Sequence, residues 1–224
     1  MTEAEWLSEA ANPQWMAFHL TECKMPRTKA GRRKLRLFAC GCCRVTWGLL
    51  PDDRLRGAVE VAERFADGRA TKMELAASHM ASEAMRGRSQ QPAGTPVGVR
   101  VAIQMVGAAT NSEAFHAAFM MTATELPLGG VIPQKIAGRY ICNLFRDIFG
   151  NPFRPVTFSP SWLTPTTVAI AEAIYADRAF DRVPILADAL QDAGCEEEAI
   201  LAHCRGDGVH VRGCWVVDGV LGKG

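Results

Sequence analysis

Apolar residues recur every three or four positions along most of the chain, and this spacing constrains the fold more than any other feature of the sequence. Between residues 35 and 49 the apolar series on one helix face consists of Leu35, Phe38, Cys42, Val45 and Leu49. A second apolar series in the same stretch falls on another face, which is typical of a helix at the centre of a bundle. We therefore predict a long central helix from about Arg32 to Leu50.

Proline, glycine and capping residues divide the chain into helices. Asn12-Pro13 predicts a helix start, Thr71 with Glu74 forms a capping-box pattern, and two prolines after Gly150 end a helix. No strand-rich stretch, dinucleotide-binding glycine motif or P-loop motif is present. We predict an all-α fold, a compact multi-helix domain of about ten helices. Residues 1–224 are expected to form a single helical domain with a flexible loop at 87–96.

Composition excludes several classes of protein. The chain has 224 residues, of which 48% are apolar and 22% charged, which is typical of a globular protein and not of a disordered or fibrous one. A net charge of +1 gives no overall attraction to nucleic acid or membrane. The acidic start Met1–Trp6 lacks the features of a signal peptide, and no apolar run reaches 18 residues. We expect a cytoplasmic protein with reduced cysteines and no membrane partner.

Eight cysteines are the unusual feature of this composition, and three of them lie within Cys40–Cys43. Cysteine and histidine at helical spacing can share a face and ligate a soft metal such as zinc. His210 and Cys214 are four residues apart, and a short turn after Cys204 would bring Cys204 beside this pair. The candidate metal ligands are Cys40, Cys43, Cys204, His210 and Cys214. The alternatives are that these cysteines pack the core, or that Cys40 and Cys43 form a redox-active pair.

A basic stretch from Lys24 to Pro51 contains eight Lys and Arg residues and no acidic residue. It is either a solvated loop and helix face or a phosphate-binding patch. The candidate nucleic-acid-binding residues are Arg32, Arg33, Lys34 and Arg36. The centre of the stretch lacks interleaved aromatic residues, so stacking on single-stranded bases is not indicated.

Several motifs together resemble a family of uncharacterised bacterial proteins found in planctomycetes. These are the segments 34–44 (KLRLFACGCCR), 146–155 (RDIFGNPFRP), 179–190 (AFDRVPILADAL), and 203–215 (HCRGDGVHVRGCW). The resemblance is strongest in the last 80 residues or so of the chain. The resemblance implies a bacterial cytoplasmic protein, and it indicates no particular activity, cofactor or partner.

Three hypotheses for function follow from these observations. The first is a helical module that acts through contacts with a protein partner and carries a structural Cys/His metal site holding zinc. The second is nucleic-acid binding through residues 24–44. The third is a thiol-dependent enzyme using Cys40 or Cys204. Because no Ser/His/Asp arrangement or nucleophile-elbow motif can be singled out, an enzyme is the less expected outcome.

Overall fold

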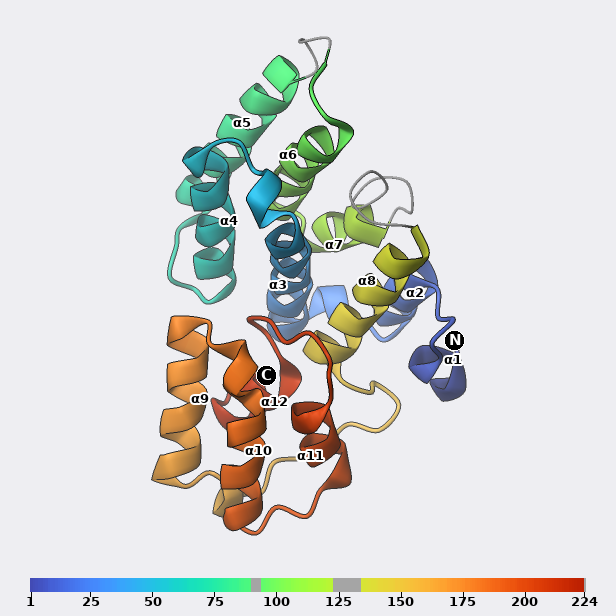
Figure 1. Cartoon of the computed structure of the whole chain (residues 1–224), viewed down its shortest axis with the longest axis vertical. Helices are drawn as coiled ribbons and strands as arrows, with labels where there is room; N and C mark the ends of the chain where they lie inside the picture. The colour runs from blue at the N-terminus through green and yellow to red at the C-terminus, as the bar shows by residue number, and fades with distance from the viewer. Residues whose placement is uncertain (90–93, 123–133, 224) are drawn as a thin grey trace. The chain divides into compact units, whose positions relative to one another are not determined.

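The computed structural model describes residues 1–89, 94–122 and 134–223, and α-helices and short 3-10 helices are the regular elements of these residues (Figure 1). The predicted all-α class is confirmed. The chain divides into two compact units, residues 1–142 and 143–224, with α8 crossing the boundary. The single domain over residues 1–224 stays a prediction. No helix of the described ranges is both long and apolar enough to cross a membrane.

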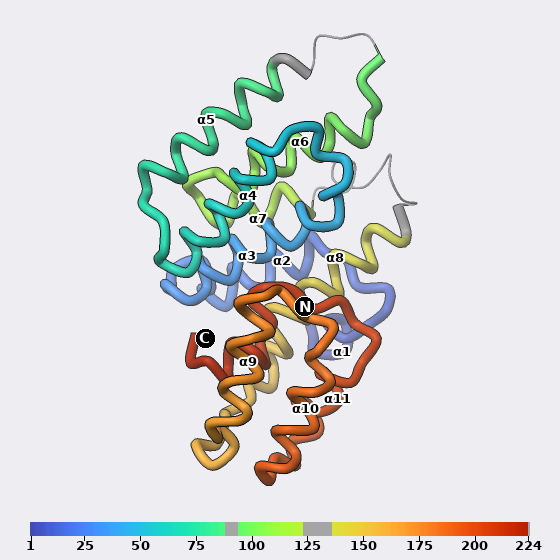
Figure 2. The backbone as a smooth tube through the Cα atoms, turned by 60° about the vertical axis from the view of Figure 1, so that its left-hand side comes forward, coloured from blue at the N-terminus to red at the C-terminus, as the bar shows by residue number. Residues whose placement is uncertain are grey.

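In its described residues, the first unit contains seven α-helices and the start of an eighth. Their bounds are α1 Glu3–Leu7, α2 Pro13–Glu22, α3 Lys29–Val45, α4 Asp53–Ala66, α5 Lys72–Ser89, α6 Val97–Thr110, α7 Ala114–Thr122 and α8 Gln134–Phe149, with 3-10 turns η1 Met25–Arg27 and η2 Trp47–Leu49. Helix α3 is central and packs against α4, α6 and α7, while α5 packs on α4 and α6 (Figure 2). The predicted caps at Asn12 and Thr71 are confirmed, because each side chain accepts the expected backbone N–H bonds.

The central helix begins and ends earlier than the sequence predicts. It starts after Thr28, whose hydroxyl accepts a bond from the Gly31 amide, and it ends at Val45 instead of Leu50. Thr46 turns its hydroxyl back to the Cys43 carbonyl at 3.1 Å, and η2 follows. Serine and threonine hydroxyls that bond to nearby carbonyls compete with helix propagation, which explains the early end.

The region predicted as a flexible loop, 87–96, differs at its start. Residues 87–89 continue α5 as helix, residues 90–93 lie outside the described part of the chain, and α6 begins at Val97. The glycine at position 87 is tolerated inside the helix, at a cost of about 1 kcal/mol relative to alanine.

Arg36 joins α3 to the end of α6 in the first unit. Its guanidinium donates hydrogen bonds to the backbone carbonyls of Ala109, Asn111 and Ser112 at 2.7–3.0 Å, and the side chain is 2% exposed. A cation at the carboxyl end of a helix satisfies carbonyls that have no partner within the helix. This residue is therefore a structural connection between two helices.

The second unit has its own apolar core. It contains the end of α8, followed by α9 Pro165–Asp177, α10 Val183–Asp192, α11 Glu198–Arg205 and α12 Trp215–Val220, with 3-10 turns η3 Pro160–Trp162 and η4 Phe180–Arg182. Helix α9 packs against α10 and α12, and α10 packs against α11. The buried residues of this core come from all four of these helices and the turns between them, including Ile174, Leu186 and Val217.

The last predicted helix, Val209–Leu221, is wrong over its first half. Residues 209–214 form a loop, and α12 begins only at Trp215. Gly213 has a φ of +101°, which no residue adopts inside a right-handed helix, and the Val211 amide bonds to a side chain instead of a helical carbonyl. This loop contains His210 and Cys214.

Candidate metal centre

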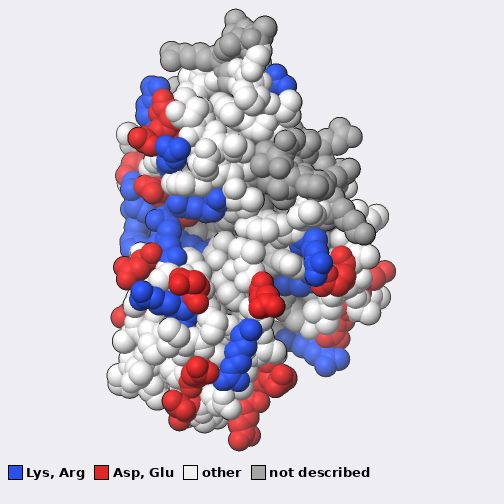
Figure 3. All heavy atoms as spheres, in the orientation of Figure 1, with Lys and Arg blue, Asp and Glu red and all other residues white. Residues whose placement is uncertain are grey.

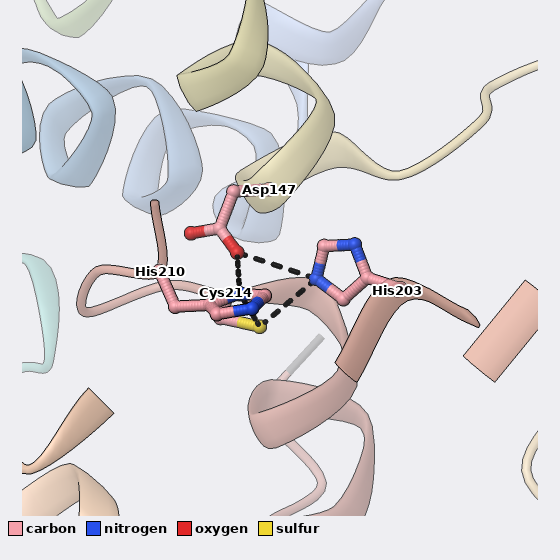
Figure 4. A group of neighbouring side chains, drawn as sticks. All are labelled: Asp147, His203, His210 and Cys214. Carbon is pink, nitrogen blue, oxygen red and sulfur yellow. Dashed lines mark hydrogen bonds and ion pairs between the residues drawn. The ribbon is translucent and has the colours of Figure 1, made fainter. Parts of the chain in front are cut away.

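Four side chains in the second unit converge on one point: Asp147, His203, His210 and Cys214 (Figure 4). One carboxylate oxygen, one nitrogen from each imidazole and the thiol sulfur all lie within 4.8 Å of one another. Within the described residues, this is the one group of three or more His, Cys, Asp or Glu side chains that could hold a metal ion.

Asp147 lies in the last turn of α8 and is 3% exposed. Its Oδ2 accepts a hydrogen bond of 2.9 Å from the Val211 backbone amide. Its Oδ1 lies 2.7 Å from His210 Nδ1 and 3.3 Å from His203 Nε2. The carboxylate therefore holds the 209–214 loop with one oxygen and faces both imidazoles with the other.

His203 comes from α11 and is held by ring contacts on two sides. Its ring centroid lies 4.9 Å from that of His210 and 5.2 Å from that of Trp215. Trp215 packs against Gly150, where a Cβ would lie 3.3 Å from the indole and where φ is +64°. Glycine at this position both ends α8 and leaves room for the ring that supports His203.

Cys214 directly precedes α12 and completes the group. Its sulfur lies 3.3 Å from His203 Nε2 and 3.8 Å from His210 Nδ1. The thiol is fully buried, and the His210 side chain is 6% exposed. His210 Nε2 is buried and has no hydrogen-bond partner within the described part of the chain. One edge of this imidazole is therefore unsatisfied by protein groups, while the other faces the cluster.

Burial and the two histidines set the electrostatics of the group. Burial raises the pKa of the Cys214 thiol well above its ordinary value, and the nearby Asp147 carboxylate adds to this effect. For Asp147, burial raises the pKa, but hydrogen bonds from His203 and His210 outweigh it, so the pKa is lowered overall. A free thiolate is thus strongly disfavoured here, whereas a bound metal ion deprotonates a coordinating thiol outright.

The geometry fits a four-coordinate metal ion. In a tetrahedral zinc site with bonds of about 2.0–2.3 Å, neighbouring ligand atoms lie roughly 3.3–3.8 Å apart. The four separations given above run from 2.7 to 3.8 Å. Small movements of the side chains would open the shortest of them, between Asp147 and His210, to the required distance. The group could therefore hold a metal ion with only protein ligands.

The structure brings together two of the five cysteines and histidines named as candidate ligands. His210 and Cys214 belong to the group, although they reach it from a loop and not from the predicted helix face. Cys204 lies in the apolar core of the second unit and is not a member. Cys40 and Cys43 are buried on α3 of the first unit, where the Cys40 thiol is 4.0 Å from the Val59 carbonyl.

The sequence alone does not identify Asp147 and His203 as ligands. The signal at Asp147 is an acidic residue between Leu144 and Ile148, on the buried side of α8. The signal at His203 is its place seven residues before His210. Neither signal selects a ligand without knowledge of how α8, α11 and the 209–214 loop meet.

The basic residues named as candidates for nucleic-acid binding differ in exposure. Arg32 is exposed, Arg33 and Lys34 are half-buried, and Arg36 is buried with its donors on three carbonyls. Arg36 is thus not presented to a phosphate, because its guanidinium is committed inside the first unit.

Comparison of the chain with protein-family models, with curated proteins and with solved structures gives no match. The geometry of the site therefore carries the functional argument alone.

Proposed function

We propose that this chain is a zinc-binding helical protein in which Asp147, His203, His210 and Cys214 hold one structural zinc ion. The observation that carries the proposal is the convergence of four different ligand atoms from α8, α11 and the 209–214 loop within 4.8 Å. Imidazole, thiolate and carboxylate are the ligands that zinc takes in proteins.

The ligand set favours zinc over iron–sulfur clusters, calcium and magnesium. A single thiolate cannot hold an iron–sulfur cluster, which takes four cysteine ligands in its common form. One carboxylate is too few for calcium or magnesium, which prefer oxygen ligands. Two histidines and one carboxylate also suit non-haem iron, but that site keeps open positions for oxygen. Here Cys214 fills a fourth position.

A structural role is supported by the burial of the ligands. Asp147, His210 and Cys214 are each at most 6% exposed, and His203 is 17% exposed. Catalytic zinc keeps a position for water or substrate, whereas structural zinc has four protein ligands. Such an ion would fasten the 209–214 loop and the start of α12 to α8. We further propose that the protein acts through contacts with a protein partner.

The thiol-enzyme alternative is disfavoured by the same burial. A catalytic thiol needs access to substrate and a lowered pKa. Cys40 is buried with a pKa raised by desolvation, and desolvation raises the pKa of the buried Cys204 to about 12.

Elemental analysis of untagged protein tests the proposal. We expect about one zinc per chain in the wild type and in Cys204→Ala, and less than about one tenth of that in Cys214→Ala. Cys204 and Cys214 are both fully buried in the same core, so this pair of variants separates ligation from packing. Cobalt-substituted wild type should show a thiolate-to-cobalt charge-transfer band that Cys214→Ala lacks.

Wild-type protein free of zinc after refolding with zinc would refute the proposal, as would full zinc content in Cys214→Ala. Stoichiometric copper or iron in place of zinc would refute the choice of metal. His203→Gln and Asp147→Asn serve as further variants, since each nearly keeps the size of the side chain and removes the imidazole or the carboxylate.

A further inference from the structure

A cluster of basic side chains surrounds the start of α3 in the first unit. Residues 24–33 contain five Lys and Arg and no acidic residue. Four of the five are exposed, namely Lys24, Arg27, Lys29 and Arg32. Arg32 Nη1 donates to the Arg27 carbonyl at 2.9 Å, which keeps its guanidinium over η1. These five residues form the basic patch, together with Arg69, which follows α4.

The fold extends the patch to the turn after α4. Arg33 Nη2 lies 3.1 Å from Asp67 Oδ1, and Arg69 Nη2 lies 3.1 Å from Asp67 Oδ2. One carboxylate, itself 2% exposed, is thus shared by two guanidiniums, and Arg69 remains 58% exposed. Figure 3 shows Lys and Arg gathered on the left, where the lower half of α4 lies in Figure 1. Two segments distant in sequence, residues 24–33 and the turn after α4, therefore together carry an excess of positive charge.

This arrangement runs against helix stability. The first turn of α3 contains no acidic residue, and Lys29 and Arg32 lie at the positive end of the helix dipole. Acidic residues would be favourable there and basic ones are unfavourable. Basic residues that destabilise the start of α3 are explained if a negatively charged partner binds to them.

We propose that the basic patch binds the phosphate backbone of duplex nucleic acid, independently of sequence. Residues 1–142 carry 18 Lys and Arg against 13 Asp and Glu, so the first unit attracts polyanions although the whole chain is nearly neutral. No aromatic residue lies within residues 24–33, so the patch offers no stacking platform for unpaired bases.

A duplex is a better partner for this patch than a membrane. Stable attachment of a protein to a lipid surface needs buried apolar area or a lipid anchor in addition to basic residues. The large apolar side chains that are exposed on the described surface do not include any from residues 24–33. Backbone phosphates, in contrast, are bound by Lys and Arg alone.

Fluorescence anisotropy with a labelled DNA duplex of about two helical turns tests the proposal. The logarithm of the binding constant should fall linearly with the logarithm of salt concentration, with a slope of about −0.9 for each phosphate contacted. In Lys24→Gln/Arg27→Gln/Lys29→Gln, we expect the slope to become shallower by about 2–3 and the affinity at 0.1 M salt to fall on the order of 10²-fold.

The matched control is Arg100→Gln/Arg139→Gln/Arg182→Gln, which removes the same charge from exposed positions elsewhere. It should bind within about threefold of the wild type. An equal loss of affinity in both triple variants would show that binding depends only on net charge, and it would overturn the proposed patch. So would unchanged binding in the patch variant, or no salt-dependent binding by the wild type at low salt.

Vesicles containing phosphatidylserine provide the second probe. Binding to vesicles that the patch variant loses, without binding to the duplex, would overturn the proposal in favour of a membrane. All of these variants retain the four proposed zinc ligands, so their zinc content should equal that of the wild type. Failure of the zinc proposal would therefore leave this one standing, and the reverse also holds.

Discussion

At the scale of single residues, the eight cysteines differ sharply in exposure. Cys23 is exposed at the end of α2, and the other seven are buried. Burial also raises the pKa of several of them, including Cys42 and Cys43, so the reactive thiolate is suppressed. The cysteine content that sets this composition apart therefore presents one accessible thiol.

We predict that iodoacetamide adds one label to the native protein, at Cys23. The other thiols should react at least about 10²-fold more slowly, because each needs a local opening of the fold. Intact-mass spectrometry against time measures the number of labels, and peptide mapping locates them. Cys23→Ser should show no rapid label, and fast labelling of Cys40 or Cys204 would contradict the burial of these two thiols.

The periodicity of the sequence predicts burial better than it predicts ligation. The phase of Cys42 with Leu35 and Phe38 correctly places it in the core. The sequence does not identify Asp147 as a ligand, since a single acidic residue in an apolar helix face has many explanations. Its role depends on His210, which is 63 residues away and reaches it through a loop. Local patterns carry no information about such a long-range contact.

At the scale of elements, the sequence predicts helix boundaries set by local caps better than boundaries set by tertiary contacts. The starts at Asn12 and Thr71 depend on side chains within three residues of the helix, so local pattern is sufficient. The short α12 is different, because the 209–214 loop is held by Asp147 from another helix. Where a tertiary hydrogen bond competes with a helical one, propensity alone extends the helix too far.

Arg36 provides a test of how two elements are joined. Replacing it with alanine leaves the carbonyls of Ala109, Asn111 and Ser112 without their charged donor. We expect Arg36→Ala to lower the free energy of unfolding by about 3–4 kcal/mol, from the loss of charge-assisted hydrogen bonds at a buried position. Urea unfolding followed by circular dichroism measures this change.

Two further variants make the test of Arg36 specific. Arg36→Lys should recover part of the loss, because one ammonium group cannot reach all three carbonyls. The exposed Lys29→Ala, on the same helix, should stay within about 0.5 kcal/mol of the wild type. A loss of less than 1 kcal/mol in Arg36→Ala would mean that the α3–α6 connection is held by other contacts.

At the scale of the whole molecule, the two units differ in charge and in chemistry. Residues 143–224 carry seven Lys and Arg against eleven Asp and Glu, the opposite of the first unit. The proposed zinc ligands all lie in the second unit, and the basic patch lies entirely in the first. The chain is nearly neutral because the positive net charge of the first unit and the negative net charge of the second nearly cancel.

This separation predicts where zinc changes stability. Since zinc binds only the folded site, it stabilises that site by about 3–4 kcal/mol at 100–1,000 times its dissociation constant. Hydrogen exchange measured by mass spectrometry should then slow by up to about 10²–10³-fold in peptides covering residues 143–151 and 203–220. The Val211 amide, which donates to Asp147, is among the protected groups. Peptides from α3 and α6 should not change, and Cys214→Ala should abolish the effect. Protection spread equally over both units would show that zinc does not act through this site, whereas bound zinc without added protection would show that it does not fasten the loop.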